Sequence, residues 1–183
     1  MKPLSTLGYI NLSMLAKPVC DREIYKTIKK YKFRSFVEIG MANGTRSQNM
    51  IRVAKKFGVA TNVRYTGVDE FDARGESQEP LSLIEMHKNL KAMDAKTQLV
   101  PGDVKSAVAR IANSHVRTDL IIISAGVDVE ALKASWFYFP RMLHSASIVM
   151  VQKSAGAGFR RLNRMQIEKL ANKQRPATSA KAA

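Results

Sequence analysis

A glycine-containing stretch near residue 40 has the residue types and spacing that could bind a ligand. It reads FVEIGMANGTRSQNM, from Phe36 to Met50. An apolar run reaches Glu38, Gly40 and Gly44 follow, and apolar residues then recur at helical spacing. Glycine permits positive φ and a close approach of backbone to ligand, while the first N–H groups of the next helix favour a carboxylate or phosphate. The stretch therefore predicts a strand–loop–helix unit that binds an anionic group, although it lacks the G-x-G-x-x-G spacing of a dinucleotide site.

Polar or glycine residues also follow three further apolar runs, and these residues are Asp69 and Glu70, Gly102 and Asp103, and Ser124. A carboxylate at position 69 could accept both hydroxyls of a ribose, and one at position 103 could contact an adenine amino group. Glu38 could meet a positive group of the ligand. A ligand with a carboxylate, a cationic group, a ribose and an adenine satisfies this set. S-adenosylmethionine is such a ligand.

Each of these residues also has a purely structural interpretation. Gly40 and Gly44 can serve as turn glycines, Asp103 can cap a helix, and Glu38 can brace the loop. Single positions do not separate the two interpretations. Their joint placement at the ends of successive apolar runs favours the ligand site.

The rest of the chain alternates predicted strands and helices. The strands are expected at about 35–39, 63–68, 97–100, 120–123 and 147–151, with helical periodicity between them. This alternation indicates an α/β fold, a Rossmann-like, doubly wound and mainly parallel five-stranded sheet of order 3-2-1-4-5 with helices on both faces. Such sheets bind ligands at the carboxyl ends of their strands, where the strand order reverses.

The sequence resembles the class I S-adenosylmethionine-dependent methyltransferases from about residue 21 to residue 152. VEIGMANGTRS resembles their first motif, an acidic residue followed by a glycine loop. YTGVDEFDAR resembles the second-strand motif, whose acid holds the ribose, and this acid corresponds to Asp69. LVPGDVKSAV resembles the segment that lines the adenine, which here contributes Gly102, Asp103 and Val104.

The resemblance implies S-adenosylmethionine as cofactor and methyl transfer to an acceptor that the sequence does not identify. Methyl transfer from a sulfonium is an in-line displacement in which the protein mainly aligns the reacting atoms. The cofactor-binding residues expected from the motifs and the strand ends are Glu38, Gly40, Met41, Ala42, Asn43, Gly44, Asp69, Glu70, Gly102, Asp103, Val104 and Ser124.

The fourth-strand segment departs from the family pattern. DLIIISAGVDVEALKASW is most similar to small methyltransferases that read D-L-V-F-I-D-G-D-H-S-Y-E there, but residues 124–127 are Ser-Ala-Gly-Val in place of Asp-Gly-Asp-His. In relatives those groups can bind a metal or lie near the acceptor, so no metal site is expected here. The remaining candidates for a general base are Asp128 and Glu130, and Asp128 is more simply a helix N-cap.

The resemblance to this family also gives the expected domain boundaries. We expect a lead-in at 1–20, a methyltransferase-like domain at 21–158, a basic helix at 159–174 and a disordered tail at 175–183. The family fold adds two strands after the fifth helix. Because 32 residues follow Val151, we expect these two strands to be missing.

The charge distribution adds a second hypothesis. The net charge is +15, and residues 1–34 carry 8 basic and 2 acidic side chains, whereas residues 153–183 carry 8 and 1. The body between them is nearly neutral, with 14 basic and 12 acidic side chains. Basic ends can bind RNA or another polyanion by releasing counterions. The alternative is a solubilising tail and a solvated helix face, because aromatic side chains for base stacking do not alternate with the charges of the tail.

The remaining features of the composition bear on the cellular compartment and on the partners of the protein. One cysteine, Cys20, excludes an intramolecular disulfide and favours a reducing, cytoplasmic location. Because no apolar run approaches the ~20 residues of a membrane span, no membrane partner is expected. The sequence leaves open whether the protein forms a homodimer. The alternative to an enzyme is a catalytically inactive methyltransferase-like module with a binding or regulatory role. The basic termini offer such a module a means of association with nucleic acid.

Overall fold

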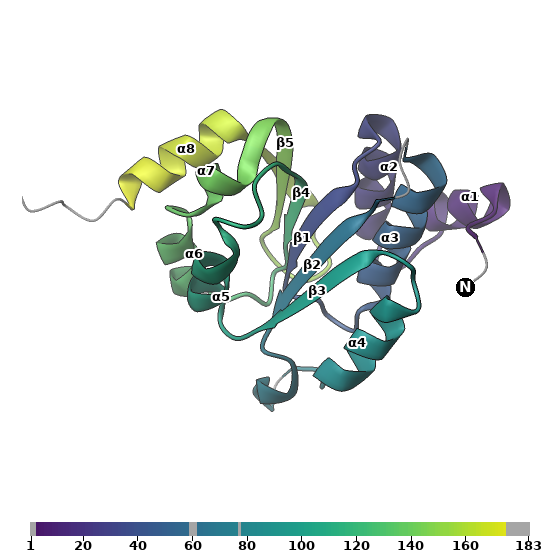
Figure 1. The fold of residues 1–183 in the computed structure, drawn as a ribbon, viewed down its shortest axis with the longest axis horizontal. Coiled ribbons are helices and arrows are strands. Elements are labelled where there is room, and N and C mark those ends of the chain that lie inside the picture. The colour runs from purple at the N-terminus through teal and green to yellow at the C-terminus, as the bar shows by residue number, and fades with distance from the viewer. Residues whose placement is uncertain (1–2, 59–61, 77, 175–183) are drawn as a thin grey trace, which may run out of the picture.

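A six-stranded sheet forms the centre of the fold (Figure 1), in the computed structural model that describes residues 3–58, 62–76 and 78–174. The strand order is β3-β2-β1-β4-β5-β6, and the first five strands are parallel while β6 runs antiparallel to β5. The strands are β1 (Ser35–Ile39), β2 (Arg64–Asp69), β3 (Lys96–Pro101), β4 (Thr118–Ile123), β5 (Leu143–Gln152) and β6 (Phe159–Asn163). The strand order reverses between β1 and β4, so the carboxyl ends of these strands flank the predicted ligand edge.

Helices cover both faces of the sheet (Figure 1). One face carries α1 (Thr6–Met14), α2 (Asp21–Tyr31), α3 (Thr45–Phe57) and α4 (Leu83–Lys91). The other carries α5 (Val104–Ile111), α6 (Val129–Ser135), α7 (Phe139–Met142) and α8 (Arg164–Lys173). A short 3₁₀ helix, η1 (Phe71–Ala73), follows β2.

Two hydrophobic cores lie on opposite sides of the sheet because side chains alternate along each strand. Phe36 and Leu120 pack under α2 and α3, whereas Val37 and Ile121 pack under α5 to α8. The central strands are buried on both faces, as a continuous apolar run such as Leu120–Ile123 predicts. The predicted α/β, Rossmann-like architecture is therefore confirmed.

The predicted number of strands is wrong, because the structure has a sixth strand within the segment expected to be a basic helix. Phe159–Asn163 pairs with β5 across a turn in which the Ala157 N–H donates to the Ser154 carbonyl, and Phe159 and Leu162 are buried. Helix α8 begins after it, at a capping box formed by Asn163 and Gln166. Polar residues at three of the five positions of FRRLN concealed the strand from the sequence pattern.

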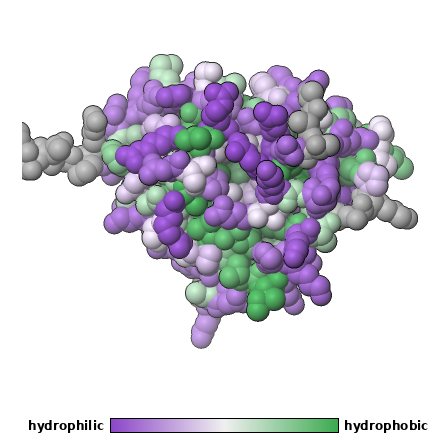
Figure 2. All heavy atoms as spheres, in the orientation of Figure 1, coloured by the Kyte–Doolittle hydropathy of each residue, from purple (hydrophilic) through white to green (hydrophobic). Residues whose placement is uncertain are grey.

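The chain before the sheet is also structured. The predicted lead-in contains α1, whose Tyr9 packs edge-on against Phe57 of α3 with ring centroids 4.6 Å apart. The predicted disordered tail, 175–183, lies outside the described residues. Hydrophilic residues cover most of the face shown in Figure 2. Within the described part of the chain, no helix has the length and apolarity to cross a membrane.

The burial of β6 can be tested by truncating Leu162, which is 6% exposed and packs in the core below α8. We expect Leu162→Ala to lower the free energy of unfolding by about 2–5 kcal/mol, since a large-to-small change leaves a cavity. Urea denaturation measures this, and Arg160→Ala, an exposed position of the same strand, should change it by about 0.5 kcal/mol or less. An equally small change in the free energy of unfolding for both substitutions would contradict the burial of Leu162 in β6.

Candidate functional site

The predicted strand–loop–helix unit is present at the carboxyl end of β1. Gly40 and Gly44 both have positive φ, 80° and 78°, so each glycine is needed for the loop conformation. A Cβ at Gly40 would also lie 3.0 Å from the Cβ of Ser124, on β4's carboxyl side. The loop thus packs directly against the end of the fourth strand before α3 begins at Thr45.

Two adjoining cavities open at the carboxyl ends of the parallel strands. The first, of about 300 Å³, lies beside the loops after β2, β3 and β4, and the predicted residues that line it are Gly40, Asp69, Glu70, Gly102, Asp103 and Val104. The second, of about 340 Å³, is lined by Ala42 and Ser124 of the predicted set as well as by Gly40 and Asp69. Glu38, Met41, Asn43 and Gly44 line neither cavity.

Glu38 lies beneath α3 rather than at the cavity wall, and its side chain is fully buried. Its Oε1 accepts a hydrogen bond from Arg46 Nε at 2.6 Å, and its Oε2 accepts from Ser47 Oγ at 2.7 Å and from Tyr65 Oη at 2.5 Å. The positive group that this carboxylate meets is therefore a side chain of the protein. These contacts agree with the structural interpretation, in which Glu38 braces the loop.

Arg46 connects the ends of the two central strands. Its Nη2 donates to the Gly40 carbonyl at 2.8 Å and to Ser124 Oγ, and its Nη1 lies 3.6 Å from a carboxylate oxygen of Asp21 at the start of α2. Burial opposes the charge of the guanidinium, but the carboxylates of Glu38 and Asp21 raise the pKa of Arg46 above its ordinary value. Burial raises the pKa of Asp21 to about 6, against the lowering effect of Arg46. Arg46 therefore stays charged and bridges β1, β4 and α2.

Asp69, the predicted ribose acceptor, is already paired. Arg74 donates to both of its oxygens at 2.6 Å, and the backbone N–H groups of Met41 and Phe71 donate at 2.7 and 3.0 Å. A carboxylate offers about four acceptor positions, so these bonds fill them. Burial tends to raise the pKa of Asp69, but the hydrogen bonds from Arg74, Met41 and Phe71 outweigh it and lower the pKa. While Arg74 is in place, Asp69 has no free acceptor position for a ligand hydroxyl.

The other acidic candidates differ in whether their carboxylates already have hydrogen-bond or ion-pair partners within the protein. Glu70 lines the first cavity, is exposed, and its side chain takes no hydrogen bond or ion pair from the described residues. Asp103 caps α5 and its carboxylate accepts from the Ser106 N–H at 3.1 Å, while Asp128 caps α6 and accepts from the Ala131 N–H at 2.6 Å. Both still line the first cavity. Glu130 pairs with Lys133 at 2.6 Å and lines neither cavity, so the structure does not bring it to this site.

Five polar side chains that line the cavities were not identified from the sequence, and these are Arg46, Arg74, Gln78, Glu79 and Gln152. Gln78 lines both cavities. Arg46 lies in the first turn of α3, where its spacing from Glu38 could have indicated an ion pair. Arg74 follows Asp69 by five residues, but the pairing depends on η1 turning the chain back, which the sequence pattern does not reveal. Among the described residues, no group of three His, Cys, Asp or Glu side chains could hold a metal.

The pairing of Arg74 with Asp69 predicts a pH-dependent loss of stability. Replacing Arg74 with Met should lower the free energy of unfolding at pH 7 by about 3–5 kcal/mol, since it leaves a buried carboxylate without its cation. The folded-state pKa of Asp69 is below its ordinary value of 3.8, so the stability from this pair is present above pH 3.8 and is lost as the pH falls through the folded-state pKa. The difference between wild type and Arg74→Met should therefore shrink in acid.

Urea titrations at pH 7 and in acid measure this difference. Arg160→Met is the matched control, because it removes the same charge at an exposed position and should change stability by about 0.5 kcal/mol or less at either pH. A difference for Arg74→Met that is small, or that does not depend on pH, would contradict a stabilising Asp69–Arg74 pair.

Comparison with solved structures shows which proteins share this fold. A calicheamicin methyltransferase is 17% identical, with a TM-score of 0.59 over 98% of this chain and 79% of the other. An O-methyltransferase from Bacillus cereus in complex with SAH is 14% identical, with a TM-score of 0.55 over 74% and 56% of the two chains. Rv0187 from MTB, in a cofactor-bound structure, is 16% identical, with a TM-score of 0.54 over 79% and 63%.

The likeness extends over part of these proteins. The chain spans about 56–79% of the length of the three neighbours. Comparisons of the sequence with protein-family models and with curated proteins gave no match. The chain therefore has the fold of class I S-adenosylmethionine-dependent methyltransferases, at low sequence identity.

Proposed function

We propose that this chain is an S-adenosylmethionine-dependent methyltransferase that acts on an acceptor still to be identified. The observation that carries the proposal is the first cavity, in which Gly40, Glu70 and the segment 102–104 come together at the carboxyl ends of β1, β2 and β3. The methyltransferase-like motifs assign Gly40 and the segment 102–104 to the cofactor, and Glu70 is expected there from its place at the end of β2. The structural neighbours, which include an O-methyltransferase in complex with SAH, support the same reading.

The residues that line the two cavities support this cofactor. They adjoin through shared residues, including Gly40 and Gly126, and glycines let the backbone approach a ligand closely. The segment 102–104 would contact the adenine, and Glu70 offers open acceptor positions for the ribose hydroxyls. Asp69, the residue that the motif assigns to the ribose, would join it once Arg74 moves. Arg46, at the wall of the second cavity, would lie near the carboxylate of the amino-acid part.

The bound cofactor would supply the electrophilic methyl group, and the residues of this chain would position it. The polar contacts at the strand ends fix the orientation of a ligand, which is the main contribution that a protein makes to an in-line displacement. An acceptor that must lose a proton also needs a base, and Asp128 is the candidate in the wall of the first cavity. Its bond to the Ala131 N–H leaves acceptor positions for a second role.

A non-catalytic binding module is the second candidate. The buried pairs Arg46–Glu38 and Arg74–Asp69 favour it, because they satisfy within the protein two carboxylates that could otherwise serve a ligand. The loss of the Asp and His residues at 124–127 points the same way. This module would keep the fold, and it would transfer no methyl group even if it bound the cofactor.

The cofactor site is tested by calorimetric titration with S-adenosylhomocysteine. We expect micromolar binding to the wild type and an affinity weaker by about tenfold or more for Gly126→Leu. Gly126 lines both cavities, its φ is not positive, and an added Cβ would meet nothing within 4 Å, so the larger side chain enters space reserved for the ligand without straining the fold. Gly158→Leu is the matched control, because Gly158 is equally open and lines neither cavity.

The outcomes separate the candidates. Binding that Gly126→Leu weakens and Gly158→Leu leaves unchanged supports the cofactor site. Transfer of a labelled methyl group into a cell extract by the wild type, and its loss in Gly126→Leu, then distinguishes an enzyme from a binding module. A folded wild type that does not bind at millimolar ligand, or binding unaffected by Gly126→Leu, would overturn the proposal.

A further inference from the structure

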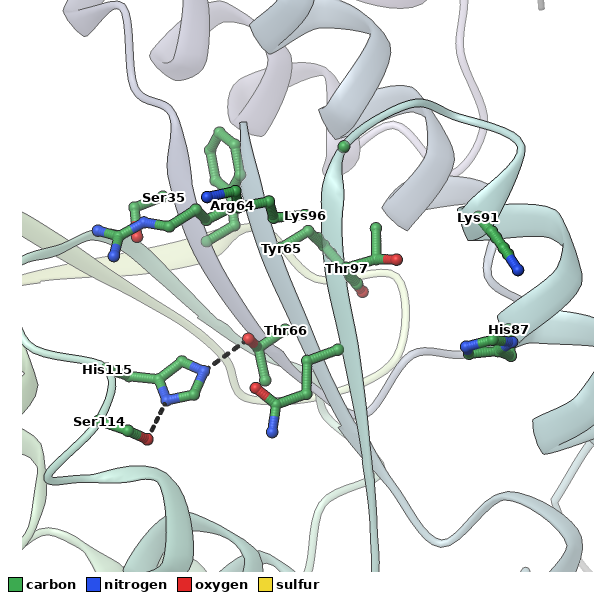
Figure 3. Close-up of a pocket in the computed structure, with 13 residues that line it drawn as sticks. Ser35, Arg64, Tyr65, Thr66, His87, Lys91, Lys96, Thr97, Ser114 and His115 are labelled. Atoms are coloured by element: carbon green, nitrogen blue, oxygen red, sulfur yellow. Dashed lines mark hydrogen bonds between the residues drawn. The ribbon is translucent and has the colours of Figure 1, made fainter. Parts of the chain in front are cut away.

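A larger cavity, of about 650 Å³, opens at the amino ends of β1, β2 and β3, on the edge of the sheet opposite the proposed cofactor site (Figure 3). The lysines and arginine that line it are Arg64, Lys91 and Lys96, two histidines, His87 and His115, also line it, and no Asp or Glu is among the described residues that do. Ligands of parallel sheets are expected at the carboxyl ends, so the methyltransferase-like fold does not account for this cavity. The cavity is within the range of sizes that hold small ligands.

Two cations that line this cavity are opposite each other in the strand register. Arg64 of β2 and Lys96 of β3 are partners in the parallel register, so their side chains share one face of the sheet. Both are exposed, and neither has a salt bridge within the described ranges. Neighbouring strands are about 4.8 Å apart, and like charges placed opposite each other destabilise a sheet. An anion between them would turn this repulsion into attraction.

Neutral hydrogen-bonding groups continue the same face. Thr66 and Gln98 form the next polar pair in the register, and Thr66 Oγ1 lies 2.7 Å from His115 Nε2. The other ring nitrogen of His115 lies 2.9 Å from Ser114 Oγ and 3.1 Å from the Ile111 carbonyl, which fixes the ring (Figure 3). Burial lowers the pKa of His115, and the nearby charge of Arg64 lowers it further. The imidazole is therefore a neutral polar group beside the two cations.

The arrangement of the side chains favours a ligand with more than one negative group. In Figure 3, Arg64 and Lys96 extend on the side of β3 that carries His115 and Thr66, whereas Lys91 and His87 extend from α4 on its other side. Positive charge therefore lines both sides of an exposed edge strand. A single carboxylate would reach the basic side chains on one side of β3, whereas a ligand with several phosphate groups can reach those on both sides.

We propose that this amino-edge cavity binds a ligand that carries several phosphate groups, with Arg64 and Lys96 as the central contacts. The phosphates can belong to a small nucleotide-like molecule or to the backbone of a nucleic acid, since both present the same chemistry to the two cations. The site is separate from the basic termini and does not rest on the proposed methyltransferase function.

The test uses the full-length chain and two probes, inorganic triphosphate and a uniform oligouridylate RNA. We expect the double variant Arg64→Ala/Lys96→Ala to weaken binding by about tenfold or more. This variant should fold, because it removes a repulsive pair from exposed positions. The control is Lys169→Ala/Lys173→Ala on α8, which removes two positive charges from exposed positions of the helix beside β5 and β6. The NMR signals of the His115 ring report where the probe binds.

Triphosphate binding that shifts the His115 signals and is lost in the Arg64/Lys96 variant supports the site with a small phosphorylated ligand. The same result with RNA alone supports a nucleic-acid backbone as the source of the phosphates. Failure of both probes to bind the wild type would overturn the proposal. Binding that the two double variants weaken equally, or that leaves the His115 signals unmoved, would also overturn it, because the attraction would then come from net charge alone.

Discussion

The buried ion pair between Arg46 and Glu38 is the interaction on which the ligand edge of the sheet depends. Glu38 is inside β1, and the cation that balances it comes from the first turn of α3. The same guanidinium reaches the Gly40 carbonyl and Ser124, so one side chain joins the glycine loop to the end of β4. A buried charge without its partner is strongly destabilising. The loop geometry and the ion pair therefore form together.

This constraint decides how a ligand could enter. A cofactor that displaced Arg46 would leave Glu38 uncompensated and would separate the loop from β4. The pair of Arg74 with Asp69 is different, since Arg74 lies in the connection between β2 and α4 and also donates to the Glu79 carbonyl nearby. Movement of Arg74 would leave the central strands in place. Arg46 therefore has a fixed structural role, whereas the contacts of Arg74 can change when a ligand binds.

The architecture could be predicted from the sequence where packing or backbone conformation restricts the residue types in a simple pattern. Leu120–Ile123 is continuous and apolar because β4 is buried on both faces, and Gly40 and Gly44 are necessary because their φ angles are positive. The sixth strand was missed because its exposed side chains are two arginines and an asparagine, and its burial depends on Phe159 and Leu162 alone. The partner of Asp69 was missed because that ion pair depends on η1 turning the chain back, whereas the spacing of Arg46 from Glu38 could have indicated theirs. The opposition of Arg64 and Lys96 is a property of strand register, which no local pattern contains.

The most direct test of the account is a crystal structure of this chain with S-adenosylhomocysteine. We predict that the adenosine occupies the first cavity against residues 102–104, with its ribose hydroxyls on Glu70 or on an Asp69 that Arg74 has left, and that the Arg46–Glu38 pair is unchanged. A ligand bound elsewhere, or one that binds at the strand ends by breaking the Arg46–Glu38 pair, would contradict the account.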